Sequence, residues 1–350
     1  MPVAQDLRPR PSRQSPFPIP PRPSATRRRS FRTHRFGPAK IRWEPRMAVS
    51  LAMDERVDVA SRRLRAALPH FLILGAAKCG TTSLHAWLSR HPQILMSTPK
   101  EPLYFELEYE MGIDYYLATY FPQWDGRKLI GESRHRNLFL PWVPKRIRAT
   151  TPDAKLIILV RNPVERCLSH WWMKYRRCKE PLHFEEAVLA NLERLESGRR
   201  HETAEEYAAY QRRRDPGGIY PTYVDSGYYI EQLERYRQLF PDTQICVLAL
   251  EDLQSRPRAV LSEVCSFLGV SASAIVGVDC ESRNAAGLLK RSRAMQDWIT
   301  CRLSGRSVSY SAIRRQPSIR PEFRRFLTDH YLPFNTDLAK ALNRDLSHWT

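Results

Sequence analysis

The stretch from Phe71 to Leu88, FLILGAAKCGTTSLHAWL, decides the fold. Its first five residues, 71–75, form a short continuous apolar run, which is typical of a buried parallel strand. Further along, Leu84, Trp87 and Leu88 are spaced i, i+3 and i+4, which is typical of a helix with one apolar face. The glycine-containing turn between the two segments therefore joins a strand to a helix.

This turn has the composition of an anion-binding loop. The phosphate loop of nucleoside-triphosphate enzymes reads G-x-x-x-x-G-K-[ST]. Gly75 and Gly80 keep that spacing, but Thr81 follows the second glycine and the lysine lies earlier, at Lys78. A strand–turn–helix aims backbone N–H groups and the positive end of the helix dipole at one point, so we expect an anion here. Hydroxyl donors in the first helical turn are Thr81, Thr82 and Ser83.

Further strands and helices alternate along the chain. Expected strands cover 128–132, 156–160 and 244–253, and expected helices cover 164–175 and 256–270. Such alternation predicts an α/β fold with a central parallel sheet flanked by helices, in a single domain over 70–350. Residues 175–226 lack strand signals, so we expect helices and loops there. We expect the aromatic cluster Trp171, Trp172 and Tyr175 to pack in the core.

The positive charge is concentrated at the start of the chain. Of the net charge of +19 over 350 residues, residues 1–46 contribute +10, from twelve Lys or Arg against two acidic residues. They also hold ten of the 27 prolines. This composition buries too little apolar surface to offset its ordering entropy, so we expect a disordered extension. A charged amphipathic helix is expected over 47–69, leading into the domain.

Seven cysteines are scattered along the chain and never spaced C-x-x-C. An odd, scattered set argues against a zinc site and against a disulfide framework, which favours a reducing, cytoplasmic location. No run of 18 apolar residues occurs, so no transmembrane helix is expected.

A second anion site is expected after the 156–160 strand. A triphosphate site needs Mg²⁺, held partly by an Asp at the end of a neighbouring strand. Arg161 stands in that place, and its guanidinium binds a phosphate directly. Ser169 follows eight residues later, two helical turns on. Two anion pockets with no metal between them are therefore predicted.

This pair of motifs resembles the sulfotransferases that use 3′-phosphoadenosine 5′-phosphosulfate (PAPS), especially bacterial members and the heparan-sulfate-type branch. Their 5′-phosphosulfate loop, K-x-G-T-[TS], is matched from Lys78 through Cys79, Gly80 and Thr81 to Thr82, and Ser83 extends it. Their 3′-phosphate motif is matched by Arg161 and Ser169. The likeness covers about 71–349. It implies PAPS as the sulfuryl donor and a carbohydrate or other hydroxylated metabolite as the acceptor, through a hydroxyl or an amine.

The resemblance also implies catalytic roles. Lys78 would stabilise charge on the leaving phosphate oxygen. Glu101, in the stretch KEPLYF, would be the general base that takes the acceptor's proton. His135 is a rival, because the small-molecule branch uses a histidine. One departure is notable: the family's E-K-[ST]-P stretch reads Glu132-Ser133-Arg134-His135-Arg136 here, so the expected lysine is missing.

The sequence disfavours two other classes of function. A nucleoside-triphosphate kinase would need the lysine after the second glycine and the strand-end Asp, and both are absent. A nucleic-acid-binding protein would show a helix-turn-helix or zinc pattern, and none appears, so nucleic acid is not expected as a partner. A basic loop over 282–293 could close over the nucleotide through Asn284, Lys290 and Arg291. The acceptor's identity and the oligomeric state have no signal in the sequence.

Overall fold

The computed structural model describes residues 68–198, 203–212, 222–275, 291–303, 305 and 309–349. The expected disordered extension over 1–46 and most of the expected helix over 47–69 lie outside these residues. So do Asn284 and Lys290 of the expected basic loop, and the side chain of Arg291.

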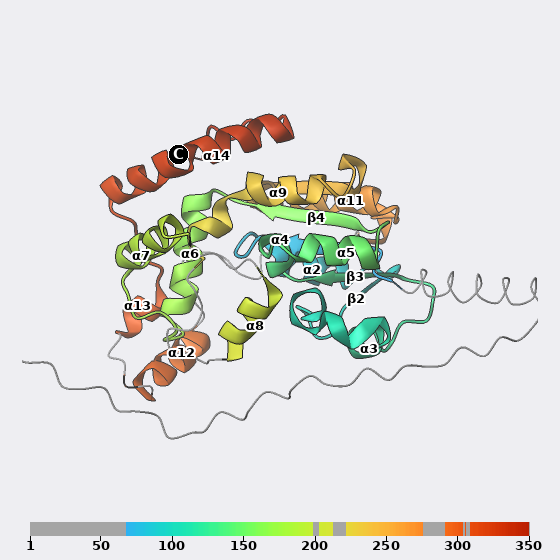
Figure 1. Cartoon of the computed structure of the whole chain (residues 1–350), viewed down its shortest axis with the longest axis horizontal. Helices are drawn as coiled ribbons and strands as arrows, with labels where there is room; N and C mark the ends of the chain where they lie inside the picture. The colour runs from blue at the N-terminus through green and yellow to red at the C-terminus, as the bar shows by residue number, and fades with distance from the viewer. Residues whose placement is uncertain are drawn as a thin grey trace, which may run out of the picture. The chain divides into compact units, whose positions relative to one another are not determined.

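A five-stranded parallel sheet forms the centre of the domain (Figure 1). The strands are β1 (Phe71–Gly75), β2 (Ile94–Met96), β3 (Leu129–Ser133), β4 (Lys155–Val160) and β5 (Ile245–Ala249), in the order β2-β3-β1-β4-β5. The predicted α/β class is confirmed. Strand β2 was not expected, because three residues carry too little pattern. Since β1 pairs with both β3 and β4, residues after these three strands meet at one edge of the sheet.

Helices next to the sheet bury its apolar strands. They are α2 (Thr81–Leu88), α3 (Gly112–Tyr120), α4 (Arg136–Phe139), α5 (Val143–Thr150), α9 (Tyr229–Arg237), α10 (Leu250–Ser255) and α11 (Pro257–Leu268). Short turns complete this part: the π-helical turn η1 (Tyr104–Glu108) and the 3₁₀ turns η2 (Tyr109–Met111), η4 (Asp242–Gln244) and η5 (Ala272–Ile275). Every residue of β1 is buried, as its continuous apolar run predicts.

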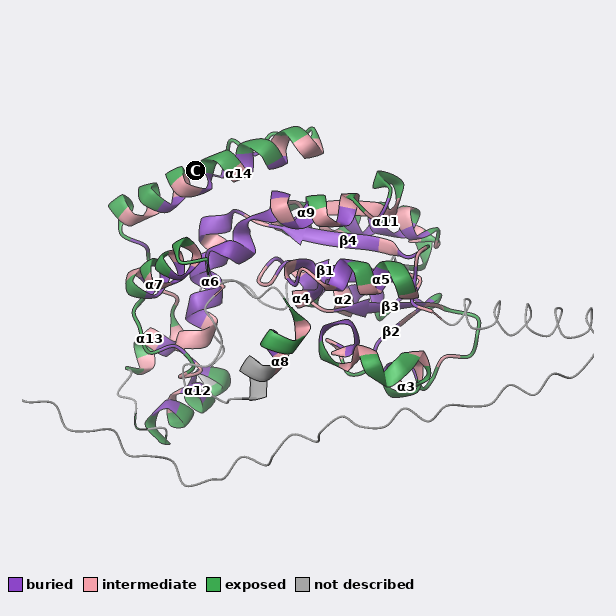
Figure 2. Cartoon of the chain, in the orientation of Figure 1, coloured by how far each residue is buried: buried purple, intermediate pink, exposed green. Residues whose placement is uncertain are grey.

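A second group of helices surrounds α6 (Pro163–Tyr175), most of which is buried (Figure 2). Its members are α7 (Phe184–Glu196), η3 (Asp225–Gly227), α12 (Arg291–Leu303), α13 (Tyr310–Arg314) and α14 (Pro321–Leu342), whereas α8 (Ala204–Arg212) contacts η1. Trp171 and Trp172 are 3% and 7% exposed, so the prediction that they pack in the core is confirmed. This packing holds α6 rigidly beside the sheet edge.

One expectation about the cysteines is wrong. Cys178, just after α6, pairs with Cys301 on α12 as a disulfide, with Cα atoms 5.4 Å apart. Spacing along the chain could not show this pair, because the two residues are 123 positions apart and only packing brings them together. Within the described ranges, no helix is both long enough and apolar enough to cross a membrane.

Candidate active site

The turn between β1 and α2 has the conformation of an anion cradle. Lys78 and Gly80 adopt positive φ angles of 72° and 93°, which folds the backbone back toward the start of α2. Among described residues, no acceptor takes the N–H groups of Gly80, Thr81 and Thr82, as expected for a helix start without a side-chain cap. A Cβ at Gly80 would lie 2.8 Å from Cδ1 of Leu250, so this position requires glycine.

Lys78 lies close to other positively charged side chains. Burial, and then the positive charges of Arg176, Arg177 and Arg161, lower the pKa of Lys78 to about 8. No acidic side chain within the described residues pairs with it. A bound anion would relieve this repulsion, so the loop is prepared for negative charge.

Cys79 is structural rather than reactive. Its thiol is fully buried and lies 3.6 Å from the Tyr229 hydroxyl. Burial raises the pKa of Cys79 to about 11, which keeps the thiol protonated. Its contribution to the site is therefore the shape of the loop. Of the three hydroxyl residues, Thr81 and Ser83 are buried and Thr82 is exposed.

Arg161 lies against the loop, as predicted. Its Nη1 is 3.5 Å from the carbonyl oxygen of Lys78. The next residue, Asn162, caps α6 by accepting hydrogen bonds from the backbone N–H groups of Val164 and Glu165, at 2.9 and 3.3 Å. This cap fixes the direction of the helix that carries Ser169.

The charges around Arg161 leave it available to an anion. Glu165 is 3.8 Å from the guanidinium of Arg161 but only 2.7 Å from Arg324 of α14, which partly neutralises the carboxylate. Ser169 is buried, with 8% of its surface exposed. The structure thus places Arg161 beside the loop and Ser169 on the capped helix that follows Arg161; their binding roles stay predictions.

Glu101 lies at the centre of a polar cluster and has a positive φ of 68°. Its carboxylate accepts from Lys100 Nζ at 2.9 Å and from Arg134 Nη1 at 3.1 Å, and His135 Nδ1 is 3.0 Å away. Burial favours the neutral acid, but the hydrogen bond and charge of His135, together with Lys100, lower the pKa of Glu101 well below its usual value. The two rival base residues therefore form one pair.

His135 is brought to the anion loop by the end of β1. A Cβ at Gly75 would lie 2.7 Å from the backbone oxygen of His135, so a glycine is needed for this approach. Burial lowers the pKa of His135, although Glu101 opposes the shift.

Arg134 takes the place left by the missing lysine. Its guanidinium contacts Glu101 and also the buried carboxylate of Glu106, to which Nε donates at 2.6 Å. Glu132, in contrast, is fully buried and bonded to Tyr116 and Asn137, so it is structural. A cationic side chain thus lies one residue beyond the position of the expected lysine and contacts Glu101.

Several residues of the site were not predicted. Lys174 lies one turn beyond His170 on α6, and burial followed by the charges of Arg136, Lys179 and Arg177 lowers the pKa of Lys174 to about 8. The signal available in the sequence was the basic run at the end of the α6 helix, MKYRRCK. Glu106 and Tyr207 gave no signal, because their contact joins positions 101 apart.

In the part of the chain that the structure describes, no group of three or more His, Cys, Asp or Glu is placed to hold a metal ion.

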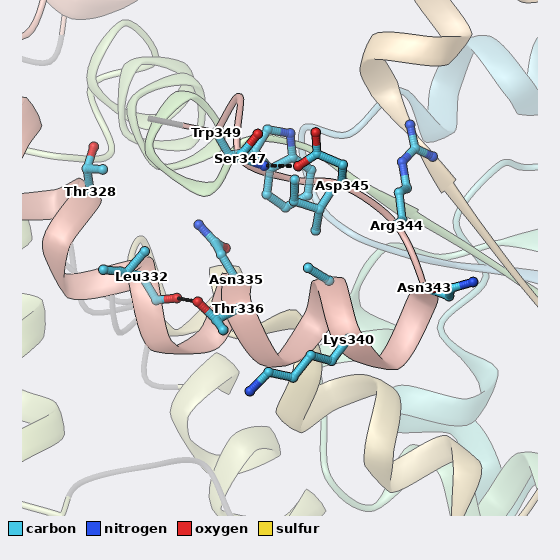
Figure 3. Close-up of a pocket in the computed structure, with 12 residues that line it drawn as sticks. Thr328, Leu332, Asn335, Thr336, Lys340, Asn343, Arg344, Asp345, Ser347 and Trp349 are labelled. Atoms are coloured by element: carbon cyan, nitrogen blue, oxygen red, sulfur yellow. Dashed lines mark hydrogen bonds between the residues drawn. The ribbon is translucent and has the colours of Figure 1, made fainter.

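A separate pocket of about 570 Å³ lies where α14 meets the C-terminal residues (Figure 3). Thr328, Leu332 and Trp349 are among its lining residues, and no predicted site residue lines it. Trp349 is 6.2 Å, ring to ring, from Tyr229, whose hydroxyl bonds the backbone of Arg161. The candidate active site is therefore the polar edge of the sheet.

Comparison with known proteins gives consistent matches. The model of the sulfotransferase domain family matches residues 68–282. The solved structure of a sulfotransferase from Alicyclobacillus acidocaldarius is similar, with a TM-score of 0.59 and 26% identity over 81% of this chain and 98% of that one.

Curated relatives match over less of their own length. The membrane-associated sulfotransferase kil1 of Dictyostelium discoideum is 30% identical over an alignment of 270 residues, and the match covers 58% of this chain and 56% of that protein. The human bifunctional heparan sulfate N-deacetylase/N-sulfotransferase 3 is 26% identical over 288 residues, 79% of this chain and 30% of that protein. The chain thus spans about a third to a half of these relatives.

Proposed function

Because the chain belongs to the sulfotransferase family, we propose that it transfers a sulfuryl group from PAPS to a hydroxyl, or to an amine, of an acceptor molecule. The observation that carries this proposal is the position of Arg161, 3.5 Å from the loop that holds Lys78, where a triphosphate enzyme would hold its metal. Two cationic sites next to each other fit a nucleotide with separate 5′ and 3′ phosphate groups.

The donor's 5′-phosphosulfate would bind the loop. The backbone N–H groups of Gly80, Thr81 and Thr82, which have no acceptor among the described residues, would donate to it, and Lys78 would supply a positive charge there. When the bond between sulfur and the phosphate oxygen breaks, negative charge develops on that oxygen, and Lys78 stabilises it. Arg161 and Ser169 would bind the 3′-phosphate.

The acceptor's proton would leave through the Glu101–His135 pair. Glu101 is the proposed general base. His135 Nδ1 lies 3.0 Å from the Glu101 carboxylate, so the imidazole would take part in the same proton transfer. Lys100 and Arg134 hold the carboxylate in place. Attack by the acceptor oxygen or nitrogen on sulfur forms one bond as the bond to the phosphate oxygen breaks.

The acceptor class is a carbohydrate or another hydroxylated metabolite. Support comes from the relative named as a heparan sulfate N-deacetylase/N-sulfotransferase. The match to that relative covers 79% of this chain. A cytoplasmic location also stays a proposal, and the Cys178–Cys301 pair weighs against it, because disulfides persist in oxidising compartments.

The experiment that tests the function uses PAPS labelled in its sulfuryl group. The purified chain is incubated with it and with a panel of mono- and oligosaccharides, amino sugars and cell extract, and labelled products are identified by mass spectrometry. A product about 80 Da heavier than its acceptor, which is the mass of SO₃, is expected. Release of inorganic sulfate alone with every acceptor would contradict the proposal.

Removing the proposed base should separate chemistry from donor binding. Glu101→Gln keeps the shape of the side chain, so we expect single-turnover transfer to slow by about 10²–10⁴-fold, the usual contribution of a general base. Affinity for adenosine 3′,5′-bisphosphate, measured by calorimetry, should stay within about twofold of the parent.

Glu110→Gln, an exposed carboxylate on the same stretch, is the matched control and should retain parental transfer. If Glu101→Gln transfers at the parental rate, the base lies elsewhere and His135 is the next candidate. If the variant no longer binds the nucleotide, Glu101 has a structural role instead.

A further inference from the structure

Beyond the residues named above, a buried carboxylate lies next to the proposed base pair. Glu106, in η1, is 1% exposed. Arg134 Nε donates to its Oε2 at 2.6 Å, and the Tyr207 hydroxyl donates to its Oε1 at 2.6 Å. A buried carboxylate needs such partners, because its desolvation is costly unless it is paired and hydrogen-bonded. Both oxygens of Glu106 are thus engaged.

Arg134 is shared between two carboxylates. While Nε contacts Glu106, Nη1 donates to Glu101 Oε2 at 3.1 Å. A guanidinium is planar and rigid, so its nitrogens cannot move independently. The position of Glu106 therefore determines how closely Arg134 approaches Glu101.

Tyr207 connects this chain of contacts to α8. The side chain is 1% exposed, whereas its neighbours Glu205 and Glu206 are exposed. The ring packs 5.7 Å from Trp142, and the guanidinium of Arg136 lies 5.3 Å above it. Among the described side chains of α8, Tyr207 therefore docks the helix on the site.

We propose that Tyr207 and Glu106 are positioning residues: through Arg134 they set the contact between Glu101 and His135, so that docking of α8 adjusts the proton-accepting pair. The chain of contacts runs from Tyr207 to Glu106 to Arg134 to Glu101 to His135, with hydrogen-bond distances of 2.6, 2.6, 3.1 and 3.0 Å. This inference rests on the proposed function, because Tyr207 and Glu106 can influence catalysis in this way only if the Glu101–His135 pair acts as the base.

Substitutions at Glu106 and at Tyr207 should shift the pKa of His135 in opposite directions. The charged and titratable groups that face His135 are Glu101, Arg134, Arg136 and His170. In Glu106→Gln, Arg134 loses a charged partner and moves fully onto Glu101, so Glu101 stabilises protonated His135 less. In Tyr207→Phe, Glu106 loses a donor and draws Arg134 away from Glu101, so Glu101 stabilises protonated His135 more.

The test is an NMR pH titration of the full chain labelled at its ten histidines, with the His135 signal assigned by its loss in His135→Gln. We expect the His135 midpoint to fall by about one pH unit in Glu106→Gln and to rise by about half a unit in Tyr207→Phe. Tyr331→Phe is the matched control, since its buried hydroxyl bonds the backbone of Val224 away from this chain. It should leave the midpoint unchanged.

Tyr207→Phe keeps the ring and its packing, so it remains informative if Glu106→Gln does not fold. Midpoints within about 0.2 unit of the parent in the folded variants, or shifts of the same sign in both, would overturn the proposal. The titration needs no acceptor or donor, so a failure to detect sulfuryl transfer is a separate result and leaves this outcome interpretable.

Discussion

Lys78 shows how burial prepares a residue for a ligand that carries the opposite charge. Burial and three nearby arginines lower its pKa to about 8, so in the free protein the ammonium is close to losing its proton. A bound phosphate favours the charged form and raises the pKa again. Affinity for the donor and the protonation of Lys78 are therefore linked.

This linkage predicts a pH dependence of donor binding. Below about pH 8 the ammonium is present and affinity for adenosine 3′,5′-bisphosphate should be constant. Above it, binding must first restore the proton, so affinity should fall by up to about tenfold per pH unit. Calorimetry in buffers of different ionisation enthalpy would detect the proton taken up on binding.

The control for this prediction is Lys78→Arg, whose guanidinium stays protonated over the whole range. Its affinity should not decline between pH 7 and 9. An equal decline in parent and variant would assign the titration to another group.

Arg161 gives a second prediction at the residue scale. Arg161→Ala should weaken binding of adenosine 3′,5′-bisphosphate by about ten- to a hundredfold, because a charge-assisted hydrogen bond contributes roughly 1.5–3 kcal/mol. Adenosine 5′-monophosphate lacks the 3′-phosphate, so its affinity should change little. Calorimetry with both nucleotides makes the comparison, and equal losses for the two would remove Arg161 from the proposed role.

At the scale of elements, the sequence predicted the strands and helices whose own residue pattern determines their secondary structure. The apolar runs of β1 and β4 and the helical spacing in α2, α6 and α11 all correspond to observed elements, and Gly269 ends α11 in the left-handed conformation. The strand expected over 244–253 is confirmed only in its first half, as β5, because Leu250–Ser255 form the helix α10. Strand β2 was missed because ILM is stabilised by pairing with β3 rather than by its own sequence.

The candidate site was predicted less completely, for a physical reason. The anion loop is contiguous, so its residues could be recognised together. The contact between Glu101 and His135 joins positions 34 apart, and Arg134 reaches it only because β3 lies beside β1. Such contacts depend on the sheet order, which local pattern does not specify.

The helix α12 provides a prediction for the cysteines. Its Asp297 pairs with Arg176, and its Cys301 is bonded to Cys178, so the disulfide tethers α12 next to cations that surround Lys78. Alkylation of the unfolded chain should label five of the seven cysteines without reductant and all seven after reduction. Closing a loop of this length contributes about 5 kcal/mol in the chain-entropy model, so reduction should lower the melting temperature.

The double variant Cys178→Ser, Cys301→Ser controls for effects of the reductant itself. Its melting temperature should not respond to a dithiol. Seven labelled thiols in the unreduced parent would show that the pair does not form a disulfide.

At the scale of the whole molecule, the central claim is that the sheet edge binds a nucleotide through two cationic sites without a metal. Lys78 at the end of β1 and Arg161 at the end of β4 are adjacent because these strands pair in parallel. A triphosphate enzyme of the same general architecture would bring an acidic residue and Mg²⁺ to the place of Arg161.

Nucleotide selectivity tests this claim most directly. Calorimetry on the intact chain would compare adenosine 3′,5′-bisphosphate with ATP, each in excess EDTA and in excess Mg²⁺. We predict that the bisphosphate binds at least about tenfold more tightly than ATP and that EDTA leaves its affinity unchanged. Tighter binding of ATP that requires Mg²⁺, with weak or no binding of the bisphosphate, would contradict the account and favour a kinase.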